Sequence, residues 1–235
     1  MIVAEQKQID EIKGYLAGHR RVLVLGCGTC VTVCLAGGER EVATLASVLR
    51  LGGGLACVPA PGVRDSGEGK LETLENTIER QCDAEFFDPI RRQAESCDAI
   101  LSLACGVGVQ LAARLFPNKP VYPALNTKFM GTNEAGGKWQ ENCLACGDCK
   151  LGVFGGVCPV TRCSKSLSNG PCGGSEEGMC EVDPERIECG WQLIYDRLKA
   201  LGKLETLLAA APPRDWSKTH SGGPRRLSRE DVVQG

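Results

Sequence analysis

The sequence is poor in the residues on which several classes of protein function depend. Its 235 residues include only two histidines, His19 and His220, so a histidine-based acid–base or zinc mechanism has little to build on. Aromatic residues make up 5% of the chain and the formal net charge is -2, which argues against base-stacking platforms and a basic nucleic-acid footprint. No apolar run approaches the roughly 18 residues that a membrane span needs. We therefore expect a protein that neither binds nucleic acid nor crosses a membrane.

A secretory signal is also missing from the first residues, MIVAEQKQIDEIKGYL, which lack a basic stretch followed by an apolar run. We therefore expect a cytoplasmic protein, whose thiols are kept reduced. The chain nevertheless contains 15 cysteines, an odd number that leaves at least one outside any complete set of disulfides. Ligation of metals or clusters is therefore favoured over disulfides.

Residues 1–125 alternate short apolar runs with stretches of helical period, a pattern typical of α/β domains with a parallel sheet. Strands are predicted at residues 21–26, 55–58, 98–104 and 120–124. Helices are predicted at residues 5–16, 32–51 with a break near Gly37, 70–82, 88–96 and 107–116. We expect a Rossmann-like α/β domain.

A glycine-containing turn follows the first predicted strand, where a dinucleotide-binding fold carries G-x-G-x-x-G. Gly26 and Gly28 fill the first two glycine positions, but Val31 occupies the third. No acidic residue closes the second predicted strand, which ends in Cys57-Val58-Pro59. The pattern therefore disfavours a nicotinamide site.

Cysteines gather at the same predicted edge of the sheet, where open α/β folds bind their ligands. Two of them lie four residues apart on one helical face, and another follows the strand at 98–104. The predicted metal ligands of this edge are Cys27, Cys30, Cys34 and Cys105. Cys57 is a substitute ligand, and buried free thiols are the alternative, because cysteine is often buried. Cys82 and Cys97 are assigned to core packing.

Residues 126–190 are predicted to be an irregular, cysteine-rich region, because periodic apolar stretches nearly vanish there. Such a segment cannot be held together by hydrophobic burial alone. A polar turn is predicted at 126–131, a C-terminal helix at 191–211 that packs on its own domain, and a flexible tail at 212–235. The predicted cofactor ligands of the region are Cys143, Cys146, Cys149, Cys158, Cys163, Cys172, Cys180 and Cys189.

Cys143, Cys146 and Cys149 place three thiols on one tight loop, as a 4Fe–4S cluster needs when three iron corners face the same backbone segment. Structural zinc sites usually take C-x2-C pairs from two separate knuckles, so the third cysteine favours iron–sulfur over zinc. In bacterial ferredoxins a fourth cysteine follows three residues later, before a proline. Here residues 150–157 intervene before Cys158, so the fourth ligand stays open.

The five cysteines from 158 to 189 suffice to close the first cluster and to build a second centre. Cys158 precedes a proline, and in two-cluster ferredoxins such a cysteine ligates the other cluster. The spacing predicts two centres between 143 and 189, and it leaves iron–sulfur and zinc equally open for the second. One cluster with several spare buried thiols is the alternative.

Several stretches together resemble the methylenetetrahydrofolate reductase C-terminal domain family, over about residues 20 to 208. They are GCGTCVTVCLAGGE, DAILSLACGVGVQ, VYPALNTKFMG, ENCLACGDCKLGVFGGVCPVTRCSKSLSNGPCGGSEEGMCEVD and CGWQLIYDRLKALGKL. The resemblance implies an electron-transfer subunit that serves the flavin of a partner and has no flavin of its own. The cysteine pattern, and not the resemblance, predicts two or three 4Fe–4S clusters, with zinc open at one centre. It implies a partner, the flavin-containing catalytic subunit of methylenetetrahydrofolate reductase, and an upstream electron-donor protein.

The residues leave two other functions open. The chain could be a zinc-binding structural or assembly module of the reductase complex. It could also be an independent enzyme that uses a cluster at the sheet edge as a Lewis acid or radical source. No catalytic acid, base or nucleophile is evident in the sequence, which favours an accessory subunit.

Overall fold

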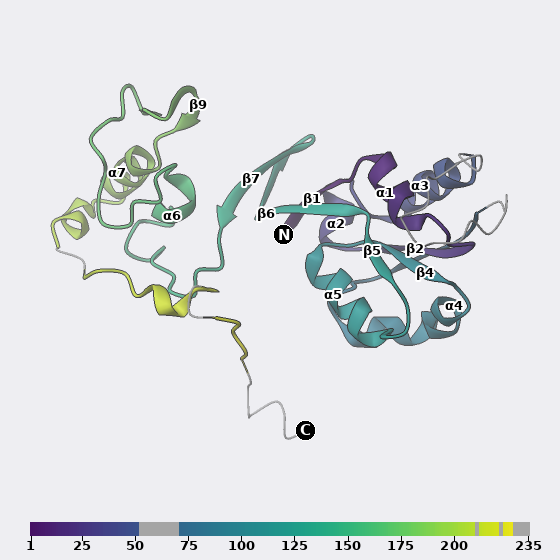
Figure 1. Ribbon diagram of the computed structural model, residues 1–235. Coiled ribbons are helices and arrows are strands. Elements are labelled where there is room, and N and C mark those ends of the chain that lie inside the picture. The colour runs from purple at the N-terminus through teal and green to yellow at the C-terminus, as the bar shows by residue number, and fades with distance from the viewer. Residues whose placement is uncertain (52–70, 210–211, 221–222, 228–235) are drawn as a thin grey trace. The chain divides into compact units, whose positions relative to one another are not determined.

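The computed structural model describes residues 1–51, 71–209, 212–220 and 223–227. The chain divides into two compact units, Met1–Gln140 and Glu141–Gly235 (Figure 1). The strand predicted at 55–58, and with it Cys57, lies outside the described residues. Within the described residues, no helix is both long enough and apolar enough to cross a bilayer.

A four-stranded parallel sheet forms the centre of the first unit, as predicted. Its strands, in the order β3-β2-β4-β5, are Glu72–Ile78, Arg21–Cys27, Ala99–Leu103 and Val121–Pro123. All neighbouring pairs run parallel. The two central strands are almost wholly buried and read as continuous apolar runs, because both faces of a parallel sheet are covered by helices. The α/β fold class is thereby confirmed.

Helices cover both faces of this sheet (Figure 1). They are α1 (Ile9–Leu16), α2 (Cys30–Val33), α3 (Glu39–Leu51), the 3-10 helix η1 (Ala84–Ile90), α4 (Arg91–Glu95) and α5 (Gly106–Leu115). Side chains alternate along β2, so that Val22 and Val24 pack with α1, α2 and α3. Leu23 and Leu25 pack with η1, α4 and α5 on the opposite face. The central strand therefore supplies two separate cores.

Two predicted helices differ in the structure. Residues 72–78 of the helix predicted at 70–82 form strand β3, which pairs with β2 from Arg21↔Glu72 to Cys27↔Ile78. This strand lies at the sheet edge and keeps polar side chains, so its sequence lacks the apolar run of a buried strand. The helix predicted at 5–16 begins at Ile9, because Ile2–Gln6 form strand β1.

A second, three-stranded sheet has the order β1-β6-β7. Strand β6 spans Leu125–Ala135 and β7 spans Lys138–Cys143, so the polar turn predicted at 126–131 is wrong. Most side chains of β6 are exposed, so its residues can be polar, and the segment therefore has the composition of a turn. A Cβ on Gly131 would lie 1.9 Å from the Gln140 carbonyl oxygen, so the close approach of β7 requires glycine there.

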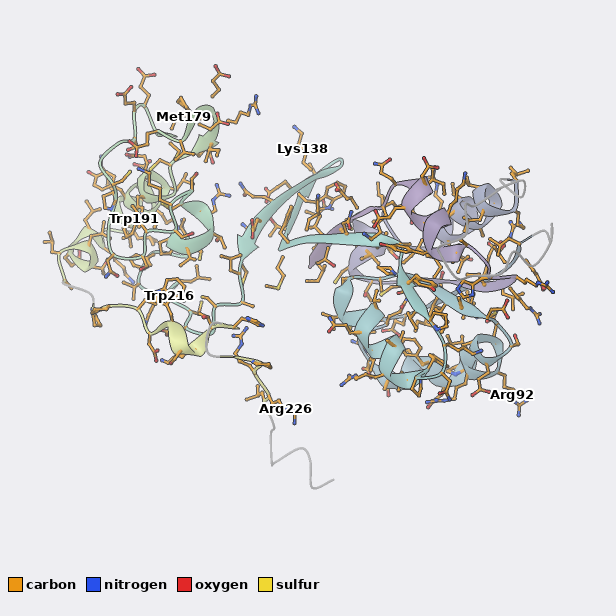
Figure 2. The ribbon with its side chains drawn as sticks, viewed as in Figure 1. Arg92, Lys138, Met179, Trp191, Trp216 and Arg226 are labelled. Carbon is orange, nitrogen blue, oxygen red and sulfur yellow. The ribbon has the colours of Figure 1, made fainter. Side chains whose placement is uncertain are left out.

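The second unit contains little regular structure. Its elements are α6 (Pro159–Arg162), β8 (Met179–Cys180), β9 (Asp183–Glu188), α7 (Gly190–Ala200) and the 3-10 helices η2 (Leu204–Leu207) and η3 (Trp216–Lys218). One small core holds it, in which α7 contributes Trp191, Ile194 and Leu198 (Trp191 is labelled in Figure 2). The predicted C-terminal helix therefore packs on its own unit, and it ends at Ala200, before Gly202 with φ +64°.

Candidate functional site

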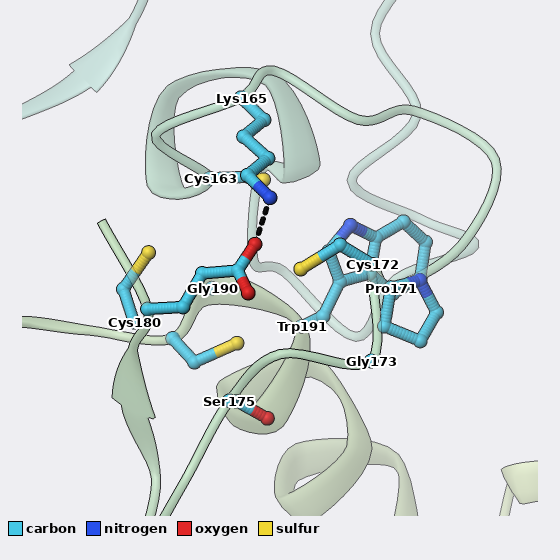
Figure 3. A pocket seen from close by; sticks show the side chains of 11 residues that line it. Cys163, Lys165, Pro171, Cys172, Gly173, Ser175, Cys180, Gly190 and Trp191 are labelled. Atoms are coloured by element: carbon cyan, nitrogen blue, oxygen red, sulfur yellow. Dashed lines mark hydrogen bonds and ion pairs between the residues drawn. The ribbon is translucent and has the colours of Figure 1, made fainter. Parts of the chain in front are cut away.

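One pocket of the second unit gathers four of the predicted ligand cysteines (Figure 3). They are Cys163, Cys172, Cys180 and Cys189. Cys158 is not among the residues that line this pocket. Cys158 instead stands at the N-cap of α6, before Pro159.

The ends of three short elements bring these thiols to the pocket. Cys163 follows α6, Cys180 ends β8 and Cys189 precedes α7. A Cβ on Gly190 would lie 2.4 Å from the Arg162 carbonyl oxygen, so only glycine lets the end of α6 approach the start of α7. The Cys189 N–H donates to the Gly178 carbonyl at 2.8 Å and fixes the β9 end to the turn before β8.

Two of the pocket sulfurs make hydrogen bonds. The Gly174 N–H donates to Cys172 Sγ at 3.5 Å, and the Cys180 thiol donates to Ser164 Oγ at 3.5 Å. The Ser164 hydrogen bond, with smaller contributions from the backbone at Val182, lowers the pKa of the Cys180 thiol. Lys165 and Glu181 form an ion pair at the pocket wall (Figure 3). The lowered pKa favours the thiolate of Cys180, which is the form that ligates metals.

The loop with Cys143, Cys146 and Cys149 continues directly from β7. Two residues in the left-handed backbone region, Ala145 with φ 50° and Gly147 with φ 82°, turn it back on itself. The Ala145 N–H donates to Cys143 Sγ at 3.3 Å, a backbone contact of the kind that surrounds metal-ligating sulfurs. Cys143 and Cys149 are exposed, and Cys146 is half-buried.

Two arginines of the C-terminal segment, Arg214 and Arg225, contact this cysteine loop. Arg214 Nη2 donates to Cys146 Sγ at 2.5 Å and to the Asp148 carbonyl at 2.8 Å. Arg225 Nη1 donates to the Ala145 carbonyl at 2.9 Å. A Cβ on Gly147 would lie 2.2 Å from the Lys218 carbonyl oxygen. No hydrophobic periodicity in this segment predicts these contacts. The one feature that the sequence offers is the presence of arginines among glycine and proline residues.

The sheet edge of the first unit holds the other predicted ligands. Cys27 ends β2, and Cys105 follows β4 as the N-cap of α5, so both lie at the carboxyl edge as predicted. Cys34 fits a ligand role poorly, because it is buried and its thiol donates to the Ala4 carbonyl at 3.5 Å, which requires the protonated form. Burial raises the pKa of the Cys34 thiol. Cys34 therefore behaves as the buried free thiol of the alternative interpretation.

Cys82 is exposed, so its predicted role in core packing is wrong, whereas Cys97 is buried among apolar side chains as predicted. Gln81, the residue before Cys82, is fully buried, and its side-chain amide donates to the Leu25 carbonyl at 2.8 Å. That bond anchors the turn after β3 at the carboxyl end of β2. Burial raises the pKa of the Cys82 thiol, and the nearby thiols of Cys27 and Cys105 raise it further. Because residues 70–82 were predicted to form a helix, the position of Cys82 after an edge strand was not predicted.

The described residues contain no group of three or more His, Cys, Asp or Glu side chains placed to hold a metal ion. The structure brings the thiols to one loop, one pocket and one sheet edge without closing them to ligand distances. Their chemistry nevertheless fits an iron–sulfur or zinc centre, since sulfur donors predominate and N–H groups donate to several of the sulfurs.

The fold and these thiols define an α/β protein with a cysteine-rich C-terminal unit. Residues 122–217 match the family model described as methylene-tetrahydrofolate reductase C terminal, which supports the family resemblance. The matched segment includes both cysteine-bearing regions of the second unit and Arg214, and it leaves out strands β2, β3 and β4. No curated protein and no solved structure matches the chain.

Proposed function

We propose that this chain is an electron-transfer iron–sulfur subunit of a methylenetetrahydrofolate reductase, similar to the small subunit called MetV. The observation that carries the proposal is the gathering of four cysteines around one pocket, within the segment that matches the reductase family. A second set of three cysteines lies on a single loop of the same segment. Four-thiol and three-plus-one-thiol arrangements are both typical of 4Fe–4S proteins.

The eight C-terminal cysteines divide into two sets of four in this proposal. The pocket takes Cys163, Cys172, Cys180 and Cys189. Cys158 then becomes the fourth ligand of the loop centre, beside Cys143, Cys146 and Cys149. Thr161 supports this division, because its hydroxyl donates at 3.0 Å to the carbonyl of Asn142, the residue before Cys143. That bond ties α6, and Cys158 at its N-cap, to the start of the cysteine loop.

A further centre at the sheet edge is proposed with a revised set of ligands. Cys27, Cys30 and Cys105 stay in the set, and Cys82 replaces Cys34. Cys82 is exposed, and it lies in the turn after β3 that Gln81 anchors to the carboxyl end of β2. An exposed thiol at this edge can be reached by a metal ion.

When bound, the clusters supply single-electron transfer, and a partner's flavin converts this into two-electron chemistry. The chain's own residues then have three tasks: cysteines hold the centres, backbone N–H groups donate to the sulfurs, and the small core around Trp191 supports the pocket. Folate chemistry belongs to the flavin-containing catalytic subunit. An upstream electron-donor protein supplies the electrons.

Metal analysis of the full chain, purified without oxygen, tests the proposal. We expect about eight iron and eight sulfide from the two C-terminal centres, in addition to the metal of the sheet-edge centre, with a broad absorption of iron–sulfur clusters in the visible range. Cys146→Ser should remove about half of the iron of the two C-terminal centres, and Cys97→Ser, a buried core position, should leave the metal content unchanged. A colourless chain with zinc and no iron would contradict electron transfer and support the structural zinc module.

Association with a flavoprotein tests the second half of the proposal. The iron-loaded chain should co-purify with a flavin-containing methylenetetrahydrofolate reductase subunit and reduce its flavin when given electrons. If the isolated chain instead turned over a substrate without any flavoprotein, the independent cluster-dependent enzyme would be the better account.

A further inference from the structure

Arg214 approaches the cysteine loop in a way that resembles a contact to a charged sulfur. Its Nη2 donates to Cys146 Sγ at 2.5 Å and to the Asp148 carbonyl at 2.8 Å. The guanidinium also stacks over Trp216, 5.0 Å from the ring centroid, which limits the orientations of the fork. The position of the side chain is therefore fixed by the loop on one side and by its own segment on the other.

A second donor of the same side chain has no acceptor. Arg214 Nε is buried, and within the described part of the chain it makes no hydrogen bond. A buried donor without a partner is costly and calls for an explanation, such as an acceptor that binds there in the functional state. The neighbouring acceptor that the proposed function would add is sulfur of a cluster held by Cys146.

We propose that Arg214 is a positioning residue of the loop centre, which holds Cys146 through Nη2 and raises the reduction potential of that centre. The inference rests on the proposed function, because it requires a cluster on Cys143, Cys146 and Cys149. Hydrogen bonds to the sulfurs and nearby charge set the potentials of iron–sulfur clusters. Reduction adds negative charge, and a fixed guanidinium stabilises the reduced state more than the oxidised state.

Arg225 provides a matched control in the same segment. It contacts the same loop, but its Nη1 donates only to backbone carbonyls, of Ala145 at 2.9 Å and Lys218 at 3.1 Å. Replacing Arg225 therefore weakens the attachment of the C-terminal segment and leaves the contact to Cys146 sulfur in place. Comparing variants of the two arginines therefore separates two effects. One is the attachment of the C-terminal segment to the loop, and the other is the hydrogen bond to the Cys146 sulfur.

The test is a redox titration of the full, iron-loaded chain, followed by electron paramagnetic resonance. For Arg214→Gln we expect one of the clusters to become about tenfold harder to reduce at a fixed potential, a shift of about 59 mV to more negative values for a one-electron couple. Arg214→Lys keeps the charge but not the fork, and it should shift the same cluster by less. Arg225→Gln should leave all midpoint potentials as in the wild type.

Three outcomes would overturn the inference. Unchanged potentials in an iron-loaded Arg214→Gln chain overturn it alone and leave the proposed function intact. An equal shift in Arg225→Gln would show that covering the loop is sufficient. If Arg214→Gln loses the loop cluster, the potential of Arg214→Lys is the test instead. A midpoint potential of Arg214→Lys identical to that of the wild type would contradict the proposed role of the guanidinium. A wild-type chain without iron overturns the proposed function itself.

Discussion

The surroundings of a cysteine decide whether its sulfur can serve as a ligand. Thiolate is the ligating form, and it is disfavoured by burial among apolar groups. Cys34 is buried against the backbone of β1, where its sulfur is already engaged with Ala4. Cys82 is exposed and follows β3 at the carboxyl edge of the sheet. Its exposure therefore favours Cys82 over Cys34 as the ligand of the sheet edge.

Replacing these two cysteines separately tests that choice. We expect Cys82→Ser to lower the metal content of the full chain by the equivalent of one centre, because a proposed ligand at the carboxyl edge is lost. Cys34→Ser should keep the metal and cost about 1 kcal/mol of unfolding free energy, as buried polar substitutions commonly do. Metal analysis and chemical denaturation measure the two effects. Equal metal in wild type and Cys82→Ser would argue against the revised set.

At the scale of elements, the pocket of the second unit depends on how closely α6 and α7 meet. Gly190 begins α7, and any larger side chain would collide with the Arg162 carbonyl that ends α6. The cysteines that flank this contact are Cys163 and Cys189, both of which line the pocket. A backbone contact between two helix ends thus sets the separation of two proposed ligands.

Gly190→Ala is expected to push the two helix ends apart and to reduce the metal bound at the pocket centre by more than half, while the loop centre keeps its iron. Gly152→Ala is the matched control, since a Cβ at that position meets nothing within 4 Å. Metal analysis together with electron paramagnetic resonance distinguishes the centres. Full occupancy in Gly190→Ala would show that the pocket tolerates the displacement.

The same scale shows which parts of the fold could be predicted from the sequence. Strands β2 and β4 are buried apolar runs, so their position and parallel pairing follow from the residue pattern. Strands β3 and β6 are partly exposed and polar, and their pairing with β2 and β1 is a tertiary effect that local periodicity does not carry.

The candidate site shows the same limit. Counting cysteines predicted two centres between 143 and 189 and left the centre of Cys158 open, because ligand number is independent of conformation. The pocket now gathers Cys163, Cys172, Cys180 and Cys189, and the prediction of two centres stays a prediction. The contact of Arg214 with Cys146 joins positions 68 residues apart and has no local signal. Cys82 was missed for a related reason, since its place follows from a strand that reads as a helix.

At the scale of the whole molecule, the two units differ in what holds them together. The first has a buried sheet with a core on each face. The described core of the second contains only five buried residues, one of which is Cys189. Hydrophobic burial is thus modest in the second unit, and bound centres are expected to supply much of its stability.

Removing the metal should therefore affect the units unequally. After treatment with a chelator and an oxidant, we expect proteases to cleave residues 141–235 rapidly while residues 1–140 stay protected. The reason is that ligand bonds replace the missing apolar burial only in the second unit. Mass spectrometry of the fragments measures the effect, with the untreated chain as control. Equal protection of both units after metal removal would contradict this view.

Strand β7 limits how the two units can be separated by protein engineering or exchanged between proteins. It belongs to a sheet with β6 and β1, yet its last residue is Cys143, the first sulfur of the cysteine loop. A cut between the units would therefore either strip a strand from one product or a cysteine from the other. The family match begins at residue 122, ahead of both β6 and β7. We therefore expect that the cysteine-rich unit can be transferred to another protein only together with strands β6 and β7.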